Sequence, residues 1–320
     1  MGDDDPEIRG VRRLRWRWLY GQPLKWWAQA LRVHFISASL IPVVLGTVVA
    51  RREVPISGWR LLLVLVGVFC YHGGANLIND LYDAEADRLN RQPSLFNGGS
   101  RVLPNNLVSV AQMKKVAVLC YMLGTGCACI LVLTGGGLLV FLFAVAGFVC
   151  GFFYSAPPLR LAATGFGELS VGLAFGPLLV IGTAAALTGR FLPTALFVSL
   201  PVGVLITAVI LINELPDFDC DQQVGKRTLV VRLGRERSIR LLAFLLVLAS
   251  CLLGMIFIRL GAAPYWAGSF LILPFLLWLW SQRRGGLKQA SRSVLASAGM
   301  ILLHLASGIL LIITVVKRGS

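Results

Sequence analysis

Two similar segments of the chain concentrate acidic side chains. Residues 77–87 read LINDLYDAEAD and residues 211–221 read LINELPDFDCD. We call them the first and second acidic motifs; together they hold eight of the 15 acidic residues of the protein. Each motif closes a long apolar segment, where carboxylates are costly and usually functional. Two matching copies therefore predict a site for a divalent metal ion.

The polar residues of both motifs have helical spacing. The aligned residues are Asn76, Asp80, Asp83 and Asp87 in the first motif region, and Asn213, Asp217 and Asp221 in the second. Separations of three and four place side chains on one face of a helix. We therefore expect one carboxylate stripe from each motif.

The donor chemistry indicates which metal ion the stripes would bind. Carboxylates that share a site of low dielectric constant repel one another, and a divalent cation removes that repulsion. The stripes contain oxygen donors without Cys or His, which favours Mg²⁺ or Ca²⁺ over zinc. Mg²⁺ commonly uses one or two carboxylates and leaves positions for water and substrate phosphates.

Basic residues follow each acidic motif. Arg88, Arg91 and Arg101 follow the first, and Lys226 and Arg227 follow the second. Acidic and basic groups together suit a metal-bridged diphosphate whose free oxygens accept hydrogen bonds from Arg or Lys. Arg88 and Arg91 fit equally well a role in membrane topology alone, whereas for Lys226 and Arg227 we favour a role in binding.

The composition indicates a polytopic membrane protein. The 320 residues are 57% hydrophobic and 14% charged, and the mean hydropathy is +0.77. Soluble domains carry about 25% charged residues. The net charge of +15 raises the possibility of nucleic-acid binding. However, residues 9–32 interleave Arg with Trp directly before an apolar span, which is typical of a segment at a membrane interface. We therefore expect a lipid bilayer as partner and no nucleic acid.

Apolar segments predict nine transmembrane helices, at about 33–50, 57–82, 107–133, 137–155, 165–188, 192–216, 238–259, 262–281 and 293–316. With a cytoplasmic N-terminus, 23 of the 30 Lys and Arg residues fall on the cytoplasmic side. The positive-inside rule therefore predicts a cytoplasmic N-terminus and a C-terminus on the opposite side.

The two acidic motifs close the second and sixth predicted spans, so both lie at the cytoplasmic ends of helices. We predict an all-α integral membrane protein with nine transmembrane helices in a bundle around a central cavity, into which both motifs face. Residues 1–32 form a cytoplasmic tail and interfacial segment, and residues 33–320 form a single transmembrane domain.

The motif pair resembles the UbiA superfamily of intramembrane prenyltransferases. The pattern Asn79-Asp80-x-x-Asp83-x-x-x-Asp87, followed by Asp217-x-x-x-Asp221, matches the two motifs that bind Mg²⁺-diphosphate in that family. The nine predicted spans, Arg32 before the first span, the loop at 154–159 and the stretch 225–229 extend the resemblance over nearly the whole chain.

The resemblance implies roles for individual residues. Two Mg²⁺ ions would be bound by Asn79, Asp80, Asp83, Asp87, Asp217 and Asp221, with Asp80, Asp83, Asp217 and Asp221 essential for catalysis. The substrates would be bound by Arg32, Asn76, Asn79, Arg101, Tyr154, Asn213, Lys226 and Arg227. The implied reaction ionises an allylic prenyl diphosphate in a cavity that excludes water.

Two segments are similar to the branch that prenylates 1,4-dihydroxy-2-naphthoate with loss of CO₂. They are residues 97–103 and Asn213-Glu214-x-Pro216-Asp217. Position 158 is Pro158, where ubiquinone-forming relatives often carry Lys, so the Lys role does not transfer. The alternative acceptors are 4-hydroxybenzoate, homogentisate, a tetrapyrrole or a glycerol lipid. A divalent-cation transporter is the rival outside this family, although basic loops beside the motifs would repel a bare cation.

Several polar residues allow two interpretations. Glu168 either contributes to the site or caps the first turn of the fifth span. Tyr154 either lines the acceptor pocket or is an interfacial aromatic residue. Asp87 and Asp219 either bind metal or orient Lys226 and Arg227. His72 and His304 lie within apolar spans, where we expect buried polar residues with partners rather than metal ligands.

Overall fold

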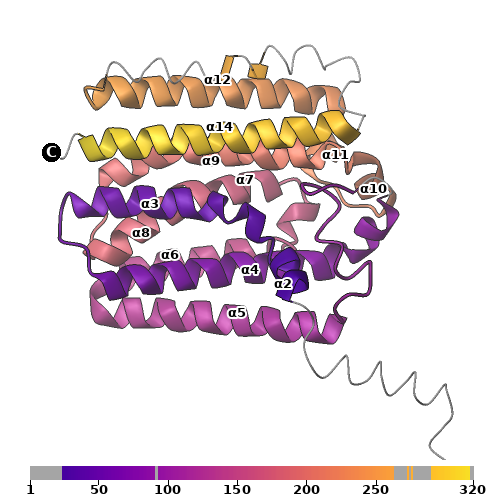
Figure 1. The fold of residues 1–320 in the computed structure, drawn as a ribbon, viewed down its shortest axis with the longest axis horizontal. Helices are drawn as coiled ribbons and strands as arrows, with labels where there is room; N and C mark the ends of the chain where they lie inside the picture. The colour runs from indigo at the N-terminus through magenta and orange to yellow at the C-terminus, as the bar shows by residue number, and fades with distance from the viewer. Residues whose placement is uncertain (1–23, 91–92, 263–271, 274, 277–289, 318–320) are drawn as a thin grey trace, which may run out of the picture.

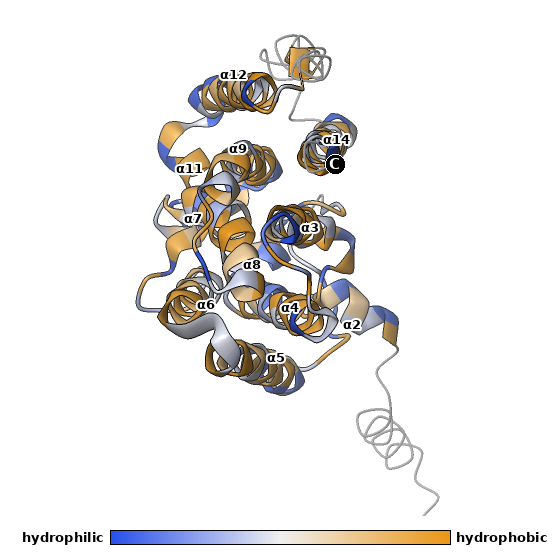
Figure 2. Ribbon diagram, turned by 90° about the vertical axis from the view of Figure 1, so that its left-hand side faces the viewer, coloured by the Kyte–Doolittle hydropathy of each residue, from blue (hydrophilic) through white to orange (hydrophobic). Residues whose placement is uncertain are grey.

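The computed structural model describes residues 24–90, 93–262, 272–273, 275–276 and 290–317. In these ranges the chain forms long helices that run side by side as a bundle (Figures 1 and 2). The principal helices are α2 (Leu24–Ala30), α3 (Ser37–Arg51), α4 (Gly58–Leu89), α5 (Val110–Leu131), α6 (Gly137–Phe152), α7 (Gly167–Leu173), α8 (Leu179–Thr188), α9 (Pro193–Glu214), α10 (Phe218–Gln223), α11 (Leu229–Leu233), α12 (Arg235–Arg259) and α14 (Ala290–Lys317).

The described residues contain seven segments that are long and apolar enough to span a membrane. One of them, Val110–Phe152, consists of α5 and α6, because Thr134 and Gly135 have non-helical backbone angles and the chain reverses there. The predicted span at 262–281 lies almost entirely outside the described residues. The all-α membrane fold is confirmed, while the number of nine helices stays a prediction.

Helix α4 is the longest element, and it carries the whole first acidic motif. Its 32 residues correspond to roughly 48 Å at 1.5 Å per residue. A hydrocarbon core is about 30 Å thick, so the helix extends beyond it. The sequence prediction ended this span near residue 82. The helix instead continues to Leu89 and holds the first motif in one rigid segment.

The second acidic motif is not one continuous helix, which corrects the predicted stripe. Helix α9 ends at Glu214, a turn follows, and the separate helix α10 begins at Phe218. Pro216 lies in this turn and has no backbone N–H to continue the ladder of helical hydrogen bonds. Asp217 consequently sits at a break between two helices.

Close helix packing at the centre of the bundle depends on small residues. A Cβ atom added to Gly176, in the π-helical turn η4 (Ala174–Leu178), would lie 2.5 Å from the Cα of Gly203 in α9. A Cβ on Gly172 would lie 2.0 Å from Oγ1 of Thr207. Small residues allow the backbones of membrane helices to approach this closely. The chain from α7 through α8 is thereby held against α9.

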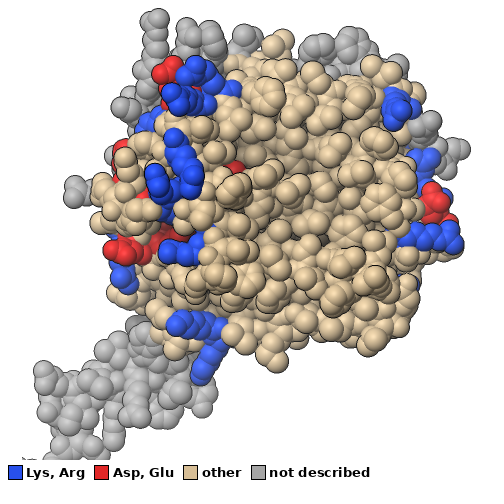
Figure 3. Space-filling model, turned by 180° about the vertical axis from the view of Figure 1, so that it is seen from behind, with Lys and Arg blue, Asp and Glu red and all other residues tan. Residues whose placement is uncertain are grey.

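The charged side chains gather at the two ends of the bundle. Figure 3 shows Lys, Arg, Asp and Glu near both ends and a broad, largely uncharged belt between them. The helices α10 and α11, with the loops beside them, lie at one end, and the C-terminal end of α14 lies at the other (Figure 1). This arrangement agrees with a bundle that crosses a bilayer and carries both acidic motifs on one side.

Candidate active site

The bundle encloses a cavity of about 290 Å³ between α4 and α9. Carboxylates from both acidic motifs gather at one end of it, while aromatic and aliphatic side chains line the rest. The polar lining residues include Arg32, Ser39, His72, Asn76, Asn79, Asp83, Asp87, Asn97, Tyr154, Ser170, Asn213, Glu214, Asp217, Asp221 and Lys226. The predicted central cavity is therefore present, and residues of both motifs face it.

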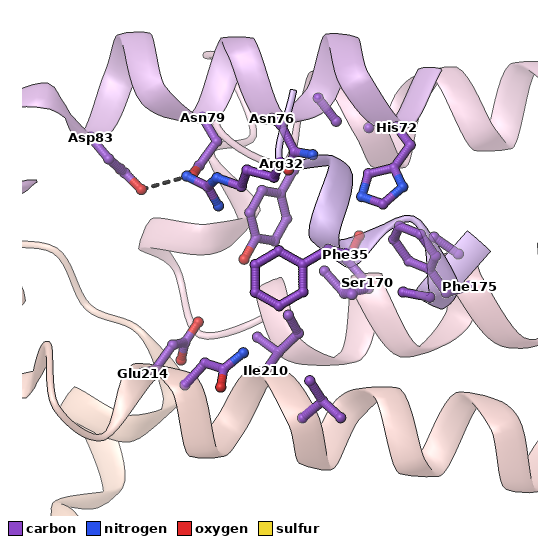
Figure 4. Close-up of a pocket in the computed structure, with 18 of the residues that line it drawn as sticks. Arg32, Phe35, His72, Asn76, Asn79, Asp83, Ser170, Phe175, Ile210 and Glu214 are labelled. Carbon is purple, nitrogen blue, oxygen red and sulfur yellow. Dashed lines mark hydrogen bonds between the residues drawn. The ribbon is translucent and has the colours of Figure 1, made fainter. Parts of the chain in front are cut away.

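The first motif divides its side chains between the cavity and the protein. Asn79, Asp83 and Asp87 line the cavity, and Asn79 donates a hydrogen bond of 2.7 Å to Asp83 (Figure 4). Asn76 also lines the cavity and donates to the carbonyl of Leu31. Asp80 is almost fully buried and is not among the lining residues.

Asp80 instead anchors Arg32. One guanidinium nitrogen of Arg32 lies 2.6 Å from the Asp80 carboxylate and also donates to Asn79 at 2.9 Å. The backbone N–H and the hydroxyl of Ser100 donate to Asp80 as well. Both Asp80 oxygens therefore have partners within the protein, and its role as a metal ligand stays a prediction.

The loop that follows the first motif holds the second motif in place. Asn90 and Asn97 donate to Oδ1 of Asp217 at 2.7 and 3.1 Å. The backbone N–H of Gly98 donates to Oδ2 at 3.1 Å. Three donors from the first loop thus compensate for the position of Asp217 at a helix break.

The loop that follows the second motif makes the reciprocal contact. The ammonium of Lys226 lies 2.9 Å from Asp83 and 3.7 Å from Asp221. Burial lowers the pKa of Lys226, but the two carboxylates outweigh it and raise that pKa well above its ordinary value. Lys226 is therefore a fixed positive charge between the two acidic motifs.

Burial also changes the carboxylates of the second motif. It raises the pKa of Asp221 to about 7, although Lys226 opposes the change. It likewise raises the pKa of Asp217, against the hydrogen bonds from Gly98 and Asn97. Neighbouring carboxylates add to the rise in both cases. Asp217 and Asp221 would therefore be stabilised by a positive charge, of which the described part of the chain itself supplies only Lys226.

The close approach of loop and helix requires glycine at position 99. Gly99 has a φ of +68°, in the left-handed region, and a Cβ atom there would meet Oδ2 of Asp87 at 1.9 Å. Arg101, two residues later, donates to the backbone carbonyl of Asp87. Arg101 therefore joins this loop to α4 and does not line the cavity.

Other predicted residues occupy different positions. Arg227 is exposed, and its backbone N–H donates to the carbonyl of Ala163. Asp219 is 70% exposed and pairs with Arg235 at 3.0 Å, so it neither lines the cavity nor orients Lys226. Tyr154 and Asn213 do line the cavity. Glu168 is fully buried in the first turn of α7.

The structure adds residues that sequence reasoning did not single out for the site. Asn97 and Gly98 bind Asp217, Ser100 binds Asp80, and Glu214 lines the cavity. In the sequence, the glycine-rich segment 97–100 could have indicated Asn97, Gly98 and Ser100. His72 also lines the cavity and pairs with Ser39, as expected. His304 is buried as expected, but neither of its ring nitrogens has a partner among the described residues, so the expected partner is wrong for His304.

Comparison with known proteins identifies the family. The model of the UbiA prenyltransferase family matches residues 39–313. The 1,4-dihydroxy-2-naphthoate octaprenyltransferase of Bacillus subtilis is 27% identical over 249 residues, covering 77% of this chain and 78% of the relative. UbiA prenyltransferase domain-containing protein 1 of Homo sapiens is 28% identical over 236 residues, covering 73% and 67%.

Solved structures agree in fold. A UbiA homologue from Archaeoglobus fulgidus, bound to GPP and Mg²⁺, is 20% identical with a TM-score of 0.64, covering 90% of this chain and 99% of that one. An apo UbiA homologue from Aeropyrum pernix K1 has a TM-score of 0.67 at 16% identity, covering 89% and 98%. The cavity, the paired acidic motifs and these matches lead to one conclusion: the chain belongs to the UbiA prenyltransferase family and is an integral membrane prenyltransferase.

Proposed function

We propose that the protein transfers a polyprenyl group from an allylic diphosphate to an aromatic quinone precursor in a reaction that depends on Mg²⁺. The best candidate for the acceptor is 1,4-dihydroxy-2-naphthoate, with loss of CO₂ from the prenylated carbon. The observation that carries the proposal is the meeting of both acidic motifs and Lys226 at one end of a cavity whose remainder is largely apolar.

The donor set of the cavity fits Mg²⁺. Its cavity-lining candidates are the amide and carboxylate oxygens of Asn79, Asp83, Asp87, Asp217 and Asp221. The described residues form no cluster of three or more His, Cys, Asp or Glu side chains that could hold a metal ion by themselves. Mg²⁺ commonly takes one or two carboxylates from a protein and its remaining ligands from water and substrate phosphates. We propose two ions, one beside each motif, which when bound would neutralise charge on the leaving diphosphate.

The chain itself supplies further groups for the diphosphate. Lys226 is a partly buried cation at the junction of the two motifs, where it can donate to a phosphate oxygen. Arg32 approaches the same end of the cavity from the start of the chain, positioned by Asp80. We propose that both donate to the diphosphate as it departs from the allylic carbon.

The apolar part of the cavity suits the prenyl group and the reaction. Phe35, Phe175, Leu179, Ile206 and Val209 line it. An allylic carbocation reacts with water, so the cavity has to keep water away until the acceptor attacks. The apolar lining provides this exclusion and contacts the isoprenoid chain.

The relatives support the proposed acceptor. The matched proteins of Bacillus subtilis and Mycobacterium tuberculosis are both named 1,4-dihydroxy-2-naphthoate octaprenyltransferase, and each is 27% identical to this chain. The test uses purified protein, Mg²⁺, a labelled prenyl diphosphate and a panel of aromatic and glycerol acceptors, with products identified by mass. We expect prenylated, decarboxylated naphthoquinol. Transfer to 4-hydroxybenzoate, but not to the naphthoate, would contradict the proposed acceptor.

We also propose that the N-terminus and the loops of the active site face the cytoplasm. The asymmetry of Lys and Arg supports this orientation. Single cysteines placed in residues 93–105 and 222–237 should react with an impermeant reagent only from the cytoplasmic side. A cysteine at Thr134 should react from the opposite side. Labelling of the two loops from different sides would contradict a shared site.

A further inference from the structure

Glu214 is a cavity residue to which the diphosphate chemistry gives no role. It ends α9 and faces Asp83 and Asn79 on α4 across the cavity (Figure 4). Lys226 forms its ion pairs with Asp83 and Asp221 and not with Glu214. A diphosphate offers only acceptor oxygens and negative charge, so without a metal ion between them a carboxylate here would repel it.

Glu214 is backed by a second buried carboxyl group. Glu168 in α7 accepts a hydrogen bond of 2.8 Å from the backbone N–H of Leu229, which fixes one of its oxygens. Oε2 of Glu168 and Oε2 of Glu214 are both buried and have no hydrogen-bond partner among the described residues. A buried oxygen of this kind accepts a hydrogen bond from any donor that reaches it.

Two more oxygens on the same wall are without partners. Oγ of Ser170 in α7 and Oδ1 of Asn213 in α9 are buried and find no partner in the described part of the chain. Both residues line the cavity together with Glu214. A buried polar atom without a partner is costly, and each of these oxygens can accept a hydrogen bond. This wall therefore presents acceptor oxygens without partners, and a ligand bearing hydroxyl groups would supply donors to them.

Resting on the proposed prenyl transfer, we propose that Glu214 binds a hydroxyl group of the acceptor substrate. Asp217 follows Glu214 by three residues, across the turn between α9 and α10, so an acceptor bound here would lie beside the diphosphate end of the cavity. The ring of Phe35 lies in the same part of the cavity and suits a flat aromatic acceptor (Figure 4).

The experiment combines substitutions in the protein with methyl ethers of the acceptor. Glu214→Leu removes the hydrogen-bond acceptor, and Glu214→Gln keeps an amide oxygen at nearly the same size. Glu236→Gln is the matched control, because Glu236 is 82% exposed. The kcat and KM are measured for prenyl diphosphate and for acceptor, using an aromatic diol and its two monomethyl ethers. The same is done with a prenylated glycerol phosphate and its methyl ether.

We expect one methyl ether to lower the acceptor kcat/KM of the wild-type protein about tenfold or more, as for loss of a hydrogen bond to a charged group. Glu214→Leu should lower the diol value by a similar factor and show no further loss with that ether. Glu214→Gln should fall between. The KM for prenyl diphosphate should stay within about twofold in all variants. The size of the ether effect in each acceptor series tells whether the hydroxyl is phenolic or belongs to glycerol.

Different results would overturn the two proposals separately. If the wild-type protein transfers no prenyl group to any acceptor, the proposed function fails. If the wild-type protein is active, but hydroxyl and ether forms react equally well, Glu214 binds no hydroxyl. An ether effect that persists unchanged in both Glu214 variants would equally place the hydroxyl elsewhere.

Discussion

The two acidic motifs are similar in sequence but are built differently. The first lies within the unbroken helix α4, whose backbone alone sets the directions of Asn79, Asp83 and Asp87. The second is broken at Pro216, and Asp217 is held by donors from the loop after the first motif. The first motif is therefore preorganised by a helix, whereas the second motif depends on the loop that follows the first motif.

The largest expected effect tests whether both motifs serve one reaction. Asp83→Asn and Asp217→Asn should each lower turnover about a hundredfold or more, since neutralisation of the leaving group is worth several kcal/mol. Removal of Mg²⁺ by a chelator should abolish turnover. Initial rates with labelled prenyl diphosphate provide the measurement, and unfolding in detergent shows that the variants fold. Activity of either variant in chelator would exclude a metal shared between the motifs.

A second prediction concerns Lys226, which contacts both acidic motifs. Lys226→Ala should raise the KM for prenyl diphosphate or lower kcat by about tenfold or more, because a hydrogen bond to a charged group is lost. Arg227→Ala is the matched control, because Arg227 is exposed and its side chain does not line the cavity. Its kinetic constants should stay within about twofold. Equal losses of activity in Lys226→Ala and Arg227→Ala would mean that the positive charge of the loop supports activity, and not the contact of Lys226 with the two motifs.

A third prediction separates two neighbouring carboxylates of α4. Asp80→Asn should lower the free energy of unfolding by roughly 1–3 kcal/mol, because it weakens a buried contact with Arg32 and Ser100. Asp83→Asn should be less damaging to stability, since Asp83 faces the cavity. Thermal unfolding in one detergent compares the two. A more stable Asp80→Asn variant would show that Asp80 belongs to the chemistry alone.

The smallest effect tests the loop that supports the second motif. Gly99→Ala places a side chain at a left-handed backbone position and against Asp87. The backbone conformation alone costs roughly 1–2 kcal/mol. We expect a several-fold loss of activity together with a lower unfolding temperature. Gly126→Ala is a suitable control, since a Cβ there meets no atom within 4 Å. Unchanged behaviour of both variants would show that the loop has freedom to move.

The helices and the cavity could be predicted because they follow from local sequence. Apolar length and charge at the ends determine a membrane span, and the spacing of Asn79, Asp83 and Asp87 determines a helical face. The break at residues 215–217 was missed although Pro216 was visible. The spacing of Asn213, Asp217 and Asp221 by four residues suggested one helical stripe. The helix ends before them all lie on it, because Pro216 has no backbone N–H for a helical hydrogen bond.

The remaining features depend on contacts between distant parts of the chain. Nothing near Asp80 shows that Arg32 and Ser100 will occupy its oxygens. Similarly, Lys226 and Arg227 are adjacent in sequence, yet one is partly buried between carboxylates and the other is exposed. Which of the two faces inward is decided by how residues 225–228 pack, and no local pattern encodes it.

The reciprocal contacts between the loops affect how the protein is made. Asp217 bonds to Asn90, 127 positions earlier, and Lys226 bonds to Asp83, 143 positions earlier. During synthesis from the N-terminus, the first motif enters the membrane with its carboxylates lacking these partners. The ribosome must add at least another 143 residues before Lys226 exists. A nascent or truncated chain that stops before Lys226 therefore lacks the cation that pairs with Asp83, so the first motif reaches its final arrangement only after most of the chain has been made.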